Sequence, residues 1–130
     1  MKDFTVLVAR VLLALIFIGS GWGKIGGYVG TQQYMEAMGV PGALLPLVIF
    51  VELGAGLALV AGLLTRLAAA GLAIFCVVSA LFFHMEWGDR IQFIMFMKNI
   101  AMAGGLLVLA AYGAGALSVD AWWHRRRSTA

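Results

Sequence analysis

Hydrophobic residues occur along the chain in four long runs, and shorter segments rich in glycine and polar residues separate them. A helix needs about 20 mostly apolar residues to cross the ~30 Å hydrocarbon core of a bilayer. Four runs approach or exceed this length: residues 4–22, 44–64, 67–83 and 91–112. The pattern therefore predicts an all-α membrane protein, a four-transmembrane-helix bundle that forms a single domain over residues 1–130.

The first run, residues 4–22, is interpreted as a retained helix, because it ends without the small-residue cleavage pattern of a signal peptide. Its residues at positions 10, 14, 17, 21 and 24 share one helical face, so Arg10 and Lys24 are expected to point the same way. Two interpretations of Arg10 stay open. Its long side chain either reaches the near membrane interface or is buried and paired.

The longest loop is expected between the first two runs. Its glycines are predicted to break the first helix, and they are Gly19, Gly21, Gly23, Gly26, Gly27 and Gly30. Residues 31–38 (TQQYMEAM) can then form two helical turns, with Gly39 as a C-terminal stop and Pro41 beyond it. This predicts a short interfacial helix between helices 1 and 2, and a lid over a binding site is the alternative.

The second run carries an acidic residue, Glu52, near its middle. Thirteen Leu, Ile, Val or Phe residues favour insertion by roughly 0.3–0.6 kcal/mol each, which outweighs the ~3 kcal/mol penalty of one central acid. An intramembrane carboxylate usually faces the bundle interior and finds a partner there. Gly54, Ala58 and Gly62, at four-residue intervals, predict a close helix contact along their row.

The remaining loops are short. Thr65 and Arg66 leave room only for a tight turn, so the second and third helices are expected to be antiparallel neighbours. Trp87, in the loop before the fourth run, is typical of an interfacial aromatic residue. The fourth run contains an adjacent polar pair, Lys98 and Asn99.

Composition and charge support the membrane assignment. Hydrophobic residues make up 63% of the chain, charged residues 12%, and the mean hydropathy is +0.99, which is far from a soluble globular protein. The net charge of +3 comes from Arg125–Arg127 near the C-terminus, so it indicates topology and not nucleic-acid binding. Cys76 is the only cysteine, which excludes a disulfide framework and a thiolate cluster for a metal.

Four spans place both termini on one side of the membrane. The positive-inside rule favours the cytoplasm for that side. The expected cytoplasmic basic residues are Lys2, Arg66 and Arg125–Arg127, and only Lys24 and Arg90 fall in the outer loops. The chain is thus expected to be a multi-pass membrane protein whose N- and C-termini are cytoplasmic.

The intramembrane charges are expected to pair. At 1.5 Å per residue, Glu52 lies ~12 Å below the outer end of its helix and Lys98 lies ~10 Å below the outer end of its own. Left unpaired, the two together with Arg10 would cost on the order of 8–10 kcal/mol. We therefore predict a pair between Glu52 and Lys98, with Arg10 approaching from the inner side as a second partner.

These residues predict a polar pocket that opens outward. Lys24 and His84 are expected at its outer mouth, Asn99 adds donors and an acceptor, and Trp22, Tyr34 and Met residues are expected to line it. A carbonyl or phenolate oxygen would suit its spare positive charge. The alternative is an ion-pair network that only fixes helix register. The candidate ligand-binding residues are Arg10, Lys24, Glu52, His84, Lys98 and Asn99, and no metal ligand set is present.

Several segments together resemble the DoxX family, and the resemblance covers nearly the whole chain. They are RVLLALIFIGSGWGKIGGY, GTQQYMEAMGVPG, LPLVIFVELGAGLALVAGLLTR, MFMKN with the following GG, and the GxG…LSVD ending. One departure is Gly113-Ala114-Gly115, where relatives commonly have a central proline. The resemblance implies a four-helix inner-membrane protein, described in the family as an oxidoreductase or as a small subunit linked to quinone-dependent redox complexes.

Three functions stay open from the sequence. The first is a quinone-linked redox subunit without its own covalently bound cofactor, because the chain has no CxxC, no dinucleotide fingerprint, and its two histidines, His84 and His124, are expected at opposite membrane faces. Its pocket would bind a quinone or phenolic ligand, and a soluble or membrane oxidoreductase would be its partner. The second is a small permease or channel component. The third is a purely structural or assembly membrane subunit, whose ion pairs only set helix packing. The lipid bilayer is the expected surrounding in each case, and a homo-oligomer stays open.

Overall fold

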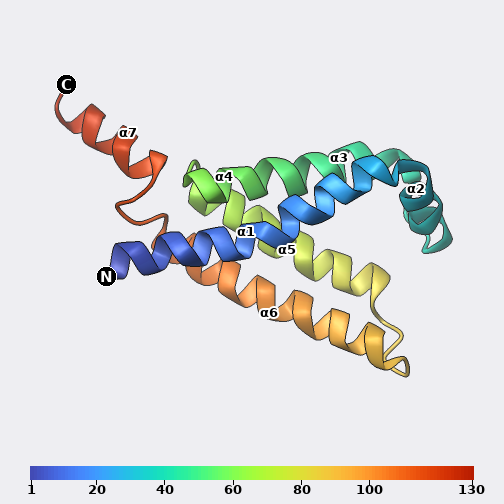
Figure 1. The fold of residues 1–130 in the computed structure, drawn as a ribbon. Coiled ribbons are helices and arrows are strands. Elements are labelled where there is room, and N and C mark those ends of the chain that lie inside the picture. The colour runs from blue at the N-terminus through green and yellow to red at the C-terminus, as the bar shows by residue number, and fades with distance from the viewer.

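The computed structural model describes all residues, 1–130, and every regular element in it is helical (Figure 1). In chain order the elements are α1 (Lys2–Gly26), α2 (Tyr28–Ala37), η1 (Gly42–Leu44), α3 (Leu45–Ile49), η2 (Phe50–Gly54), α4 (Ala55–Ala61), α5 (Thr65–Phe83), α6 (Arg90–Tyr112) and α7 (Val119–Ser128).

Four helical segments are long and apolar enough to cross a membrane, and they coincide with the four hydrophobic runs. They are Lys2–Gly26, Gly42–Ala61, Thr65–Phe83 and Arg90–Tyr112. The second segment is one continuous helix of changing type. In it η1, α3, η2 and α4 follow one another without a gap, and η2 is a π-helical turn. The predicted all-α bundle with a short helix between helices 1 and 2 is confirmed.

The first helix does end among the predicted glycines, with Gly27 as its C-cap, but the break comes later than the predicted end at residue 22. α1 continues through Gly19, Gly21 and Gly23 to Gly26. Each glycine in a helix costs only about 1 kcal/mol relative to alanine, whereas backbone groups left unpaired in hydrocarbon cost several kcal/mol each. As a result, α2 begins at Tyr28, earlier than expected.

The bundle consists of two pairs of helices (Figure 1). α1 packs along η2 and α4, and α5 packs along α6. The tight turn between α4 and α5 makes them neighbours, as predicted. Fully buried Ala14, Leu59, Leu72 and Leu106 join the two pairs in one core.

Close contact between the first two spans depends on Gly21 and Gly56. A Cβ at Gly21 would lie 2.8 Å from Leu53 Cγ, and one at Gly56 would lie 2.9 Å from Ile18 Cγ1. Gly54, by contrast, is exposed, and a Cβ there would meet only Phe50 of its own span. The predicted contact row is therefore wrong at Gly54, but it holds at Gly62, where a Cβ would clash with Arg10 of α1.

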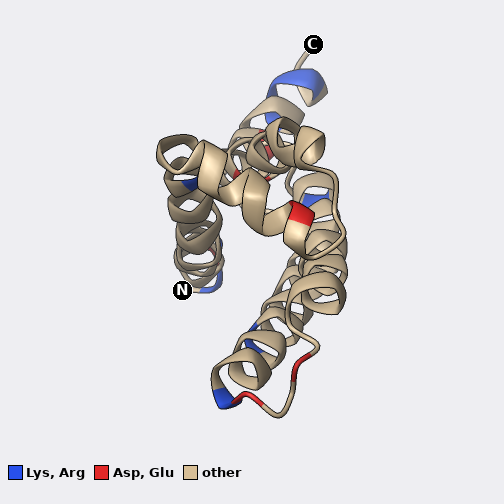
Figure 2. Cartoon of the chain, turned by 90° about the vertical axis from the view of Figure 1, so that its right-hand side faces the viewer, with Lys and Arg blue, Asp and Glu red and all other residues tan.

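Both termini lie at one end of the bundle and α2 lies at the other (Figure 1). Most of the helical surface carries no charged residue (Figure 2). Large apolar side chains face outward there, among them Phe50 and Leu67, which are more than two-thirds exposed. A surface of this kind matches a hydrocarbon environment, because monomeric soluble proteins rarely expose large contiguous apolar areas.

Candidate functional site

The π-helical turn η2 places Glu52 at its centre, inside the bundle. Turns of this type are rare and occur frequently at functional sites. The Glu52 residue is 2% exposed, so its carboxylate is cut off from the surface and depends on partners within the protein.

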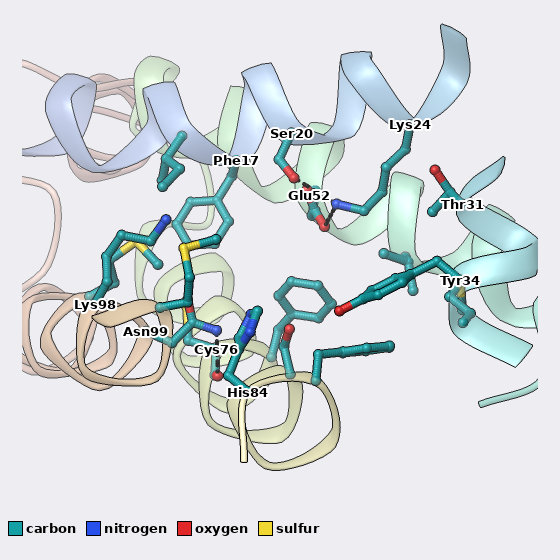
Figure 3. A pocket seen from close by; sticks show the side chains of 18 residues that line it. Phe17, Ser20, Lys24, Thr31, Tyr34, Glu52, Cys76, His84, Lys98 and Asn99 are labelled. Atoms are coloured by element: carbon teal, nitrogen blue, oxygen red, sulfur yellow. Dashed lines mark hydrogen bonds and ion pairs between the residues drawn. The ribbon is translucent and has the colours of Figure 1, made fainter. Parts of the chain in front are cut away.

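Glu52 pairs with Lys24. Its Oε1 lies 2.7 Å from Lys24 Nζ, which also donates a hydrogen bond to Ser20 Oγ at 2.6 Å (Figure 3). The predicted pairing of Glu52 with Lys98, and with Arg10 as a second partner, is wrong. The physical reason is the length of α1, because its continuation to Gly26 keeps Lys24 on a helix beside η2 instead of in a loop.

The second carboxylate oxygen of Glu52, Oε2, is buried and has no hydrogen-bond partner in the protein. Most buried polar atoms are paired, so an exception requires an explanation. Glu52 also lines a cavity, so the unpaired acceptor belongs to a side chain at the cavity wall.

The cavity has a volume of about 270 Å³ and lies toward the α2 end of the bundle. Side chains from α1, α2, α3, η2, α5 and α6 surround it. Its size is below the roughly 300–1,000 Å³ of sites for drug-sized ligands but above the roughly 150 Å³ of an engineered cavity that holds benzene. The volume suits a ligand with one ring.

Five of the six candidate residues line this cavity: Lys24, Glu52, His84, Lys98 and Asn99. Lys98 extends from α6 toward α1 and makes no ion pair or hydrogen bond with another residue (Figure 3). Asn99 is buried and donates from Nδ2 to the carbonyl of Cys76 at 3.2 Å, which fixes α6 against α5. His84 Nδ1 lies 2.8 Å from Gln92 Oε1.

Arg10, the sixth candidate, lies outside the cavity. Its residue is fully buried near the end that carries the termini, where Nη2 donates to the carbonyl of Leu117. Nε and Nη1 have no partner. Leu117 belongs to the loop that follows α6, and its contact with the guanidinium holds Arg10 at this end of the bundle, so Arg10 does not meet Glu52.

The aromatic lining differs in part from the prediction. Tyr34 lines the cavity and stacks on Phe83 with ring centroids 5.4 Å apart, which holds α2 across the end of α5. Trp22 does not line it and is 72% exposed. The inward face of α1 passes through Phe17 and Gly21, and Trp22 lies off that face.

The predicted lining did not include three hydroxyl residues, Ser20, Thr31 and Ser79. It also did not include the phenylalanines that line the cavity, Phe17, Phe75 and Phe83. Ser20 had a detectable signal, because it precedes Lys24 by one helical turn on the same face. Thr31 and Ser79 had none, since their position depends on how α2 and α5 pack.

Comparison with known proteins places the chain in one family. The DoxX family model matches residues 5–85. The inner membrane protein YqjF of Escherichia coli (strain K12) is 53% identical over 120 residues, which cover 92% of each chain. The inner membrane protein YphA of the same organism is 38% identical over 126 residues, covering 92% of this chain and 90% of YphA. No solved structure matches.

The match to the family model spans more than half of the chain, and four apolar helices accompany it. The chain therefore belongs to the DoxX family and is an integral, multi-pass protein of the inner membrane.

Proposed function

We propose that this protein is an accessory component of quinone-linked redox chemistry, and that its cavity binds a small quinone or phenolic compound. The observation that carries the proposal is that one cavity is lined by two polar groups without a partner in the protein, although they do not contact each other. Glu52 Oε2 offers a free acceptor, and Lys98 offers a free ammonium. Oxygen atoms on a ring are the groups that such a site can hold.

The rest of the lining supports a ring-shaped ligand. Phe17, Phe75 and Phe83 line the cavity with flat apolar surfaces, and aromatic rings pack well in offset or edge-to-face arrangements. In this proposal the chain binds and orients the ligand, and a partner oxidoreductase in or at the membrane exchanges the electrons.

We also place both termini in the cytoplasm, which puts the cavity toward the outer half of the bilayer. The support is the distribution of basic residues. Arg125–Arg127 extend the chain at the end that carries both termini, and cytoplasmic segments are enriched in such residues.

A structural role is the second candidate, because the Lys24–Glu52 pair ties α1 to η2. Buried ion pairs can fix the register of helices without any ligand. Under this alternative the cavity would hold lipid or water, and its polar groups would not discriminate among added compounds.

The test is ligand-dependent stability of the purified protein. A quinone or hydroquinone that binds the native state at about 100 times its Kd adds about 2.7 kcal/mol to the free energy of unfolding. We expect tetramethyl-1,4-benzoquinone or its hydroquinone to raise the Tm, and we expect Phe17→Ala to weaken the effect. Phe4→Ala is the control, because Phe4 is 61% exposed on the outside of α1. If neither the quinone nor the hydroquinone raises the Tm, the proposed function is wrong.

A further inference from the structure

We propose that the cavity selects the reduced, hydroxyl-bearing form of its ligand, through a hydrogen bond that the ligand donates to Glu52 Oε2. The inference rests on the proposed function and adds to it the oxidation state of the preferred ligand. A hydroquinone carries hydroxyl donors, whereas the corresponding quinone carries only acceptors.

Glu52 has a hydrogen-bond partner at only one of its two carboxylate oxygens. Its Oε1 accepts from Lys24 Nζ at 2.7 Å as half of an ion pair. An ionised carboxylate only accepts hydrogen bonds. Oε2 is buried and no group of the protein donates to it. The group that this side chain still lacks is therefore a hydrogen-bond donor.

Lys24 already has two partners in the protein. Two of the three ammonium hydrogens are engaged by Glu52 Oε1 and Ser20 Oγ. Lys24 thus serves mainly to hold Glu52 in place. The cation without a commitment is Lys98, whose amine extends toward α1 at the other side of the cavity (Figure 3).

The quinone and the hydroquinone differ in which groups of the protein they leave without a hydrogen bond. Lys98 can donate to an oxygen of either form, because carbonyl and hydroxyl oxygens both accept. Glu52 Oε2 is satisfied only by a hydroxyl. A bound quinone would place its carbonyl lone pairs near a buried carboxylate and leave Oε2 without a partner, which sites with buried polar groups reject. We expect a preference of roughly tenfold to a hundredfold for the reduced form.

The size and surroundings of the cavity decide which ligands fit and how they enter. The cavity of about 270 Å³ admits a single ring, and Phe17 and Phe75 contribute apolar lining. We infer access from between α1 and α6, because Ile16 and Lys98 line the cavity and are themselves exposed. A membrane-soluble phenol can approach from that side.

The experiment measures the Kd of a matched redox pair for the full-length protein in lipid nanodiscs under argon. The pair is tetramethyl-1,4-benzoquinone and tetramethylhydroquinone, whose ring is fully substituted and so resists addition by thiols. The dimethyl ether of the hydroquinone is a third probe that keeps both oxygens and has no donor. We expect the hydroquinone to bind at least about tenfold tighter than the other two.

Glu52→Gln tests the assigned atom. The carboxamide has one acceptor oxygen and one donor nitrogen, so with its oxygen on Lys24 it presents a donor to the cavity. The preference should vanish or reverse toward the quinone. Lys98→Met is the matched control in the same cavity, and it should weaken both forms by a similar factor and leave their ratio unchanged.

The outcomes separate the two proposals. Equal affinities of the hydroquinone, the quinone and the ether for the unaltered protein would overturn this inference and leave the proposed function in place. Failure of all three to bind would remove the proposed function itself. The comparison with the ether needs no variant, so the inference stays testable even when Glu52→Gln does not fold.

Discussion

Lys24 and Glu52 are 28 positions apart on different transmembrane segments, and their charged atoms meet at 2.7 Å. The pair is largely shielded, with the Lys24 side chain 25% exposed and that of Glu52 3% exposed. In a low-dielectric setting, each member depends on the other to remain charged at tolerable cost.

Removal of Lys24 should therefore strand Glu52. We expect Lys24→Met to lower the free energy of unfolding by about 3–5 kcal/mol, and the double variant Lys24→Met/Glu52→Gln to recover much of that loss. Thermal unfolding in detergent, followed by circular dichroism, measures both. Lys98→Met is the control and should change little, because Lys98 has no partner in the protein. Additive losses in the double variant would contradict the pair.

Two glycines of α1 provide a matched test of the helix contact. A Cβ at Gly21 would lie 2.8 Å from Leu53 Cγ, whereas nothing lies within 4 Å at Gly19. We expect Gly21→Ala to destabilise the bundle by about 1–3 kcal/mol through overpacking. Gly19→Ala should be neutral or stabilising by up to about 1 kcal/mol, since alanine favours helix. Equal effects on Tm would show that α1 does not approach η2 this closely.

Asp120 closes the turn between α4 and α5 from a distance in the chain. Its carboxylate accepts from the backbone N–H of Leu64 at 2.7 Å and of Thr65 at 2.9 Å, where α5 begins. Asp120→Ala should cost about 0.5–2 kcal/mol, the usual range for a lost helix cap. Hydrogen exchange of the first turn of α5 should accelerate in this variant. Asp89→Ala, at the start of α6, is the control and should leave that turn unchanged.

Topology is testable with reporters. We expect a C-terminal fluorescent protein to mature and a C-terminal alkaline phosphatase to be inactive, because Arg125–Arg127 favour the cytoplasm. A phosphatase inserted after Gly39, in the connection beyond α2, should be active. The reverse result at both positions would place the cavity toward the cytoplasmic half of the bilayer.

The spans were predictable because crossing hydrocarbon imposes a length that the hydrophobic runs show directly. The partner of Glu52 was not. If α1 ended near the first of its glycines, Lys24 would lie in a loop, and Lys98 would be the cation at the depth of Glu52. Helix propensities measured in water mislead at that point, since hydrocarbon penalises a broken helix more than it penalises glycine.

The predicted packing row of the second span fails at Gly54 for a related reason. The spacing of small residues does not show which of them face a neighbouring helix. In addition, no pattern in the sequence predicts the π-helical turn at Phe50–Gly54 that precedes Gly56. The cavity residues were found in larger part, because charged and amide side chains within apolar runs are few and have to face inward. Arg10 met that condition as well but faces a different part of the interior.

The contact between Arg10 and the carbonyl of Leu117 has a consequence for biosynthesis. The two residues are 107 positions apart, and Asp3 similarly accepts from the backbone N–H of Ala116, 113 positions later. At about 5–20 residues per second, ribosomes need on the order of 5–20 s to make the intervening chain. During that interval α1 carries a guanidinium without its acceptor, so the first helix to emerge is the last to complete its contacts, and shortened translation products retain an unmet charge.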